Sequence, residues 1–155
     1  MPAPTPPTLE FAFEARVSVS PALEAGLVHG NTRRVIPITG GIVEGPRLTG
    51  RVIPGGADWQ IVYADGAIDL TARYTIEATD GTLIGVVNRG LRTAPPDVLA
   101  RLARRETVDP SLVYFRTTPV FEAPEGPHVW LTRHIFIATA QRHPEGVQLR
   151  FFAVL

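Results

Sequence analysis

Asp58 is the residue whose sequence context best suits proton transfer. It follows the Gly55-Gly56 pair and precedes Trp59, and a carboxylate beside an indole can lose hydration, which raises its pKa toward the range of a general base. A structural role is the alternative, in which Asp58 hydrogen-bonds the glycine turn while Trp59 fills the core. The sequence favours the two interpretations equally.

A second set of charged residues recurs along one strand-like segment. Asp69, Arg73 and Glu77 are spaced by four and alternate with apolar residues. On an outer face they would form an ordinary solvated ladder of cross-strand charge pairs. On an inner face they would make a polar cavity wall that holds a ligand carboxylate or oxyanion. Solvent exposure is the commoner fate of such residues, so both placements stay open.

Further polar and aromatic residues lie within otherwise strand-like segments. An arginine inside a barrel must be paired, either with an anionic ligand or with Asp58 or Asp69. Tyr114 could donate a hydrogen bond to a developing oxyanion, or pack with its hydroxyl at the rim. We therefore predict Asp58 or Asp69 as base, with Tyr114 as oxyanion donor or general acid. The predicted ligand-binding residues are Trp59, Arg73, Asn88, Arg89, Arg116 and Trp130, and all nine are expected to converge on one cavity.

Composition excludes most other chemistry. The chain has no cysteine and no lysine, which excludes thiolate nucleophiles, zinc–thiolate sites, iron–sulfur clusters and Schiff bases. No serine lies in a nucleophile-elbow context. The histidines show no metal-ligand spacing, although His134 alternates with Trp130 and Phe136 and could face the interior. We predict no metal and no cofactor, so hydride and electron transfer are not expected.

Charge and hydropathy argue against two classes of partner. Fifteen arginines balance fifteen acidic residues, whereas a nucleic-acid binder normally carries a basic excess. No apolar run approaches the roughly 18 residues of a membrane span. Residues 1–8 are proline-rich, lack the features of a signal peptide and are expected to form a flexible tail before a single domain over residues 9–155.

The period of the apolar residues is that of β-strands. Alternation is clean over Leu9–Val19, where Leu9, Phe11 and Phe13 share one face, and again over Ala67–Thr79. Pro37 must lie at an edge or a bulge, because proline cannot donate to a strand ladder. Further strands are predicted at residues 33–39, 42–44, 48–53, 59–63, 82–91, 113–122, 129–142 and 147–154. A turn-like stretch is predicted over residues 21–31, and turns are predicted at Gly40-Gly41 and at Pro54-Gly55-Gly56.

One helix is predicted between Pro95 and Arg105. The Pro95-Pro96 pair suits a first helical turn, and an apolar stripe follows from Val98 to Ala103. About nine or ten antiparallel strands with one short helix favour an all-β domain, a closed or nearly closed barrel, because closure removes exposed strand edges.

Five segments together match one family pattern. They are Arg33–Gly41, Pro54–Gln60, Ala72–Thr75, Asn88–Gly90 and Tyr114–Pro119. In their order and spacing the chain resembles the bacterial family catalogued as domain of unknown function 3237, from residue 9 to the C-terminal end. The resemblance implies a small β-barrel, often found alone and cytoplasmic, and it implies no particular reaction.

The leading functional hypothesis is a barrel that encloses a small, partly apolar, oxygenated or aromatic molecule. Acid–base side chains favour a cofactor-free enzyme of the isomerase, cyclase, lyase or hydratase type. A non-catalytic binding protein with the same pocket is the alternative, and an interaction module with a completely filled barrel is the third. A homo-oligomer is compatible with each of them.

Overall fold

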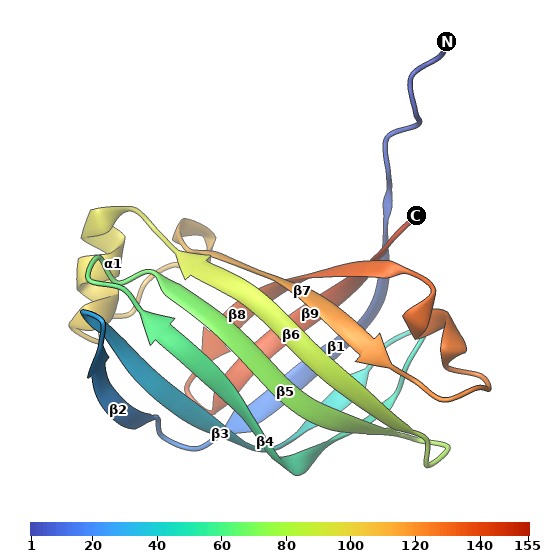
Figure 1. Ribbon diagram of the computed structural model, residues 1–155, viewed down its shortest axis with the longest axis horizontal. Coiled ribbons are helices and arrows are strands. Elements are labelled where there is room, and N and C mark those ends of the chain that lie inside the picture. The colour runs from blue at the N-terminus through green and yellow to red at the C-terminus, as the bar shows by residue number, and fades with distance from the viewer.

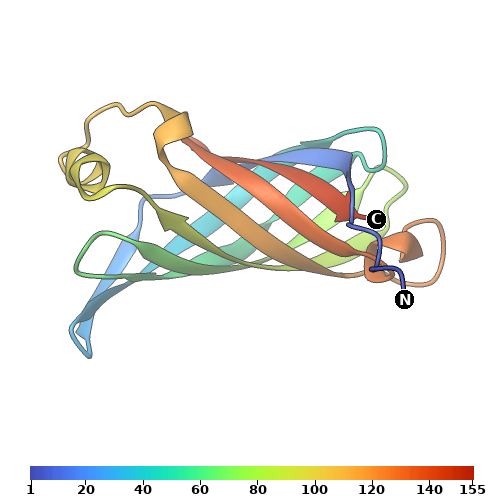
Figure 2. The ribbon, with the colours of Figure 1, turned by 90° about the horizontal axis from the view of Figure 1, so that it is seen from above.

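The computed structural model describes all 155 residues and shows a closed antiparallel barrel (Figures 1 and 2). Eight strands form the barrel in the order β1-β9-β8-β7-β6-β5-β4-β3, and pairing of β1 with β3 closes it. A ninth strand, β2, pairs only with β3 and is exposed along its whole length. The strands are β1 (Leu9–Val19), β2 (Leu23–Val28), β3 (Asn31–Glu44), β4 (Gly50–Val62), β5 (Ile68–Ala78), β6 (Leu83–Thr93), β7 (Tyr114–Glu122), β8 (Ile135–His143) and β9 (Gly146–Val154).

The all-β barrel with one short helix confirms the predicted fold class. Helix α1 (Pro96–Ala103) joins β6 to β7 and lies at one end of the barrel, the end that also bears the β2–β3 hairpin and the β4–β5 turn (Figures 1 and 2). Both chain termini lie toward the opposite end, together with the 3₁₀ turn Val129–Thr132 (Figure 2). No helix is long and apolar enough to cross a membrane.

Several predicted strand limits are corrected by the structure. Residues 21–31 are not a simple turn, because β2 and β3 form a hairpin around His29-Gly30, both with positive φ, as the tightest hairpin turns require. The Gly40-Gly41 pair lies within β3 and does not end a strand. A Cβ at Gly41 would collide with the backbone carbonyl of Arg16, so glycine here permits the close approach of β1. Residues 129–132 form the 3₁₀ turn and β8 begins only at Ile135.

Two bulges decide which side chains face inward. Pro37 lies where the register between β3 and β4 shifts, which confirms the bulge predicted for it. In β1 the register with β9 shifts between Phe11 and Phe13. Phe13 is therefore fully buried while Phe11 is only partly covered and Leu9 is exposed, so the single face predicted for these three residues is wrong.

The barrel interior is packed most densely with aromatic rings toward the end that bears the termini. Phe13 stacks on Phe151 with ring centroids 4.6 Å apart, and Phe121 meets Phe136 edge to face at 5.0 Å. Leu131, from the 3₁₀ turn, is buried in the same cluster. This end is therefore closed by side chains, and space for a ligand remains only toward α1.

Candidate functional site

A cavity lies inside the barrel between its middle and the α1 end. Its atoms leave about 420 Å³ empty, a figure that includes open solvent, but the space that the centre of a water-sized molecule can reach is only about 40 Å³, so the cavity is small. Most of its wall is apolar and comes from five different strands, through Val17, Ile38, Leu70, Phe115 and Leu149. The interaction-module hypothesis requires a completely filled barrel, and this cavity shows that the barrel is not completely filled.

Four polar side chains interrupt this apolar wall, and each has an atom without a hydrogen-bond partner. The atoms are Asp58 Oδ1, Tyr74 Oη, Asn88 Oδ1 and Thr117 Oγ1, and all four residues line the cavity. Because an unpaired polar atom inside a protein costs stability, buried groups of this kind are normally satisfied. Four such atoms around one cavity are the arrangement expected of a site that hydrogen-bonds a polar molecule.

Asp58 is held in place by a chain of hydrogen bonds. Gln60 Nε2 donates to Asp58 Oδ2 at 2.7 Å, and Gln60 Oε1 accepts from Arg34 Nε at 2.6 Å. The second contact fixes the Gln60 amide so that its NH₂ group faces the carboxylate. One oxygen of Asp58 is therefore positioned by protein, while the other remains available to a ligand.

Burial raises the pKa of Asp58 to about 6. The hydrogen bond from Gln60 and the positive charges of Arg34 and Arg142 act in the opposite direction, but they do not outweigh the loss of hydration. Burial also raises the pKa of Tyr74, and the nearby Asp58 charge adds to this effect. Near neutral pH the carboxyl group can exchange a proton in either direction, whereas the Tyr74 hydroxyl stays protonated and can donate a hydrogen bond.

Three arginines lie around a smaller space that adjoins the cavity and is here called its mouth. The mouth is lined by Asp58, Gln60, Arg92 and Arg142, and it shares wall residues with the main cavity. Arg34 lies at the same place through its contact with Gln60. Arg92 is half-buried and Arg142 is exposed, so positive charge collects here directly beside the one cavity carboxylate.

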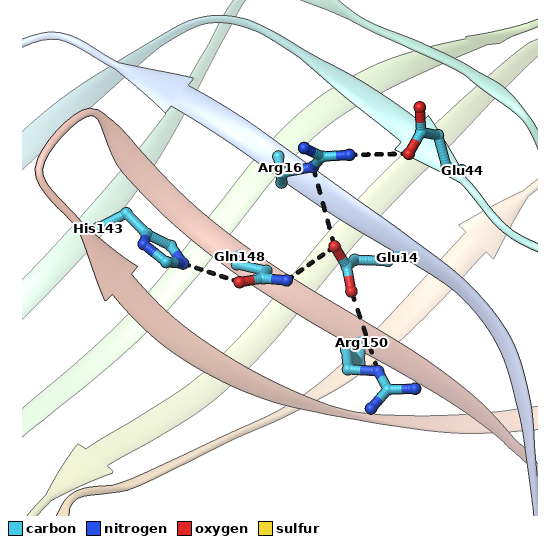
Figure 3. A network of polar contacts seen from close by, with 6 residues as sticks. All are labelled: Glu14, Arg16, Glu44, His143, Gln148 and Arg150. Carbon is cyan, nitrogen blue, oxygen red and sulfur yellow. Dashed lines mark hydrogen bonds and ion pairs between the residues drawn. The ribbon is translucent and has the colours of Figure 1, made fainter. Parts of the chain in front are cut away.

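The polar groups on the outside of the barrel satisfy one another (Figure 3). Glu14 accepts a 2.7 Å hydrogen bond from Gln148, whose amide oxygen contacts His143 at 2.8 Å. Arg16 pairs with Glu44 at 2.7 Å. These side chains on the outside of the barrel are partners for one another, in contrast to the four partnerless atoms in the cavity.

Comparison with known proteins identifies the family. The family model described as "Protein of unknown function (DUF3237)" matches residues 7–154. A UPF0311 protein of Clostridium acetobutylicum is 43% identical over 150 residues, which cover 94% of this chain and 95% of that protein. The crystal structure of a conserved protein of unknown function from Rhodopseudomonas palustris superposes with a TM-score of 0.92 at 37% identity, over 99% of this chain and 100% of the other. The chain belongs to the DUF3237 family.

Two further matches of this DUF3237 protein are to a fungus. The hydroalkoxylation enzyme phnH of Penicillium herquei is 40% identical over 81 residues, which cover 52% of this chain and 54% of that enzyme. A crystal structure of an enzyme from Penicillium herquei has a TM-score of 0.75 at 26% identity, over 100% of this chain and 99% of the other. The barrel of the DUF3237 family is therefore similar to that of at least one protein described as an enzyme.

Of the nine residues predicted to converge, only Asp58 and Asn88 face the cavity of this family member. Asp69, Arg89, Tyr114 and Arg116 lie on the outer face, where they line a shallow surface groove. The Arg89 side chain is 73% exposed and its guanidinium is 4.0 Å from the Asp69 carboxylate. This is the solvated ladder that was the alternative for Asp69. The structure brings these four residues together on the outer face and not in the interior cavity, and their predicted roles stay predictions.

The other three predicted residues also lie outside the cavity. Trp59 is 49% exposed and Arg73 is exposed, because both alternate with inward-facing residues. Trp130 belongs to the 3₁₀ turn at the closed end, where the Arg47 guanidinium lies 4.1 Å from its ring centroid. His134 is exposed there as well, with Nδ1 3.0 Å from the Trp130 carbonyl oxygen. No group of three or more His, Asp or Glu side chains is placed to hold a metal ion.

Sequence reasoning missed Arg34, Gln60, Tyr74, Arg92, Thr117 and Arg142. For two of them, the alternation of inward and outward residues along the strand could have shown the inward direction. Arg92 has the parity of the buried Ile84 and Val86 in β6, and Arg142 has the parity of Phe136 and Ala138 in β8. Extending each apolar face to the end of its strand would have placed both arginines on the inward side at the end of the barrel, where Arg92 is half-buried and Arg142 is exposed.

Proposed function

We propose that this protein is a cofactor-independent acid–base enzyme that acts on a small, partly apolar, oxygenated molecule bound inside the barrel. The proposed reactions are of the isomerase, cyclase, lyase or hydratase type. The observation that carries this proposal is Asp58, a carboxyl group with a pKa of about 6 and one free oxygen facing an apolar cavity. A protein that only binds its ligand has no need of a carboxylate poised near neutrality.

The fungal relative suggests the form of the reaction. Hydroalkoxylation adds an O–H group across a carbon–carbon double bond. A proton is delivered to one alkene carbon, a C–O bond forms at the other, and the oxygen loses its own proton. Atoms balance without an oxidant or a reductant, so the reaction needs only a group that gives and takes a proton.

In this proposal Asp58 moves the proton through its free Oδ1. Gln60 is a positioning residue, because it fixes the other oxygen of Asp58. Tyr74, whose hydroxyl stays protonated, donates a hydrogen bond to an oxygen of the substrate and so helps to orient it. Asn88 and Thr117 orient the substrate, and the surrounding apolar wall excludes water from the reacting atoms.

A small hydroxyalkene tests the proposal. We expect the protein to cyclise 2-allylphenol, whose hydroxyl and alkene can close a ring, and in D₂O to place one deuterium on carbon in the product. Asp58→Asn should lower the rate by about a hundredfold or more, the usual contribution of a general acid–base group. Asp69→Asn is the matched control, because it removes a carboxylate from the outer face, and it should leave the rate unchanged.

Two results would count against this function. Equal turnover by wild-type protein and by Asp58→Asn would remove Asp58 from the chemistry. Saturable binding of 2-allylphenol, and of hydroxyalkenes with longer tethers, without deuterium in any product would favour the non-catalytic binding protein.

A further inference from the structure

We propose that the natural ligand of this cavity is an amphipathic carboxylate, whose anionic group is held at the mouth by Arg34, Arg92 and Arg142 while its apolar body occupies the cavity. The inference deepens the proposed function by naming the substrate class of the same site. It concerns binding, and so it can be tested apart from catalysis.

The three arginines come from separate strands and converge without a carboxylate partner. Arg34 lies on β3, Arg92 on β6 and Arg142 on β8. None of them forms an ion pair with an acidic side chain, whereas seven arginines elsewhere in the molecule do. The one side-chain hydrogen bond of Arg34 is to the neutral amide of Gln60. Five other arginines also lack an ion pair, so the three at the mouth are distinguished by lying together beside the cavity.

The electrostatic environment of Arg34 and Arg92 disfavours their positive charge. Burial and repulsion from Arg142 lower the pKa of Arg34, and burial with repulsion from Arg142 and Arg34 lowers that of Arg92. The acidic groups that act against this repulsion on Arg34 are Glu24 and Asp58. Neither of them forms an ion pair with Arg34, and at neutral pH the Asp58 carboxylate, with a pKa of about 6, is one negative charge beside three guanidinium groups. A bound anion would relieve this repulsion, and the planar fork of a guanidinium fits a carboxylate in a bidentate manner.

The apolar part of the ligand is specified by what lies behind the arginines. The mouth and the main cavity share Val19, Leu70, Phe115 and Val147 as wall residues, so one molecule can span both spaces. Asp58 lines both spaces too. A carboxylate at the mouth would thus place the adjoining carbon atoms within reach of the proposed proton-transfer group.

The test compares an acid with its neutral counterpart of the same length. We expect 3-phenylpropanoate to bind at least about tenfold more tightly than 3-phenylpropan-1-ol in low-salt buffer, measured by calorimetric titration and by ¹⁵N–¹H NMR. Added salt should weaken binding of the acid and leave binding of the alcohol unchanged. Equal affinities for the two probes, or no saturable binding of the acid at millimolar concentration, would overturn the inference without any variant being needed.

Variants then locate the anion site. Arg92→Gln and Arg142→Gln should each weaken binding of the acid about tenfold and change that of the alcohol less than about twofold. Arg89→Gln is the matched control for Arg92, because it removes an exposed arginine from the outer face of the same strand. Unchanged affinity for the acid in both mouth variants would contradict the proposed role.

The outcome is distinguishable from that of the acid–base proposal. Asp58→Asn should bind the acid as well as the wild type or better, because it removes a negative charge beside the anion site. If this variant binds the acid normally while the wild type shows no turnover, the carboxylate site stands and the enzymatic proposal falls. If the alcohol binds as tightly as the acid and Asp58 still controls turnover, the enzymatic proposal stands and the carboxylate site falls.

Discussion

Asp58 should make the folded protein less stable at neutral pH than it would be with a neutral side chain at this position. Its pKa is 3.8 in its ordinary state and about 6 in the folded protein. The folded state therefore binds the proton more tightly than the unfolded state. The contribution of Asp58 to stability is fully present below about pH 4, where both states are protonated, and is lost as the pH rises to about 6. A difference of about two pKa units corresponds to about 3 kcal/mol, and residual contact with solvent reduces this to about 2–3 kcal/mol.

Asp58→Asn removes the charge and keeps the shape, and its carbonyl oxygen can still accept from Gln60. We expect the variant to be about 2–3 kcal/mol more stable than the wild type at pH 7.5 and equally stable near pH 4. Urea unfolding at a series of pH values measures this difference. A stability gap that does not change with pH, or a variant less stable than the wild type at pH 7.5, would refute the reasoning. Stabilisation by removal of a polar group is typical of residues retained for activity.

Two other expectations follow from the same geometry. Arg142→Gln should raise the pKa of Asp58 above about 6, because the positive charge of Arg142 opposes the effect of burial. This pKa can be measured by ¹³C NMR of the carboxyl carbon. A lower or unchanged pKa would contradict the assignment of Arg142 to the mouth. Phe136→Ala should lower the free energy of unfolding by about 3–5 kcal/mol, because this ring is 1% exposed and packs against Phe121. Trp59→Ala should lower it by less than about 1 kcal/mol. Similar losses for the two variants in urea unfolding would show that Trp59 belongs to the core.

The fold could be predicted because period-two alternation is a local property. The long alternating runs of β1 and β5, and the helix after Pro95-Pro96, depend on residues close in sequence. The pairs Gly40-Gly41 and Gly55-Gly56 were wrongly predicted as turns, because their role depends on strands that are distant in sequence. Gly41 permits the approach of β1, and a Cβ at Gly56 would collide with the backbone carbonyl of Arg73 on β5. Such contacts between distant strands leave no trace in the neighbouring residues.

The site was harder to predict because alternation gives the period of a strand and not the face that points inward. Toward the α1 end of β4 the usual pattern is inverted, since Asp58 and Gln60 face the interior while Trp59 is largely exposed. The assumption that an indole marks the core placed Trp59 inside. A local conflict between hydrophobicity and burial of this kind is typical of a functional site, where polar groups are held inside at a cost in stability.

The same inversion in β6 shows how the pairing of strands holds the charged mouth in place. Leu91 is exposed and the neighbouring Arg92 lines the mouth. A shift of one residue would exchange them and destroy the site. The shift is prevented by ten consecutive pairs between β5 and β6, from Ile68–Arg92 to Glu77–Leu83, which also hold Ile84 and Val86 in the core. Apolar residues in the filled half of the barrel thus fix the register that turns Asn88 and Arg92 toward the cavity, so the packing that stabilises the fold also positions the proposed anion site.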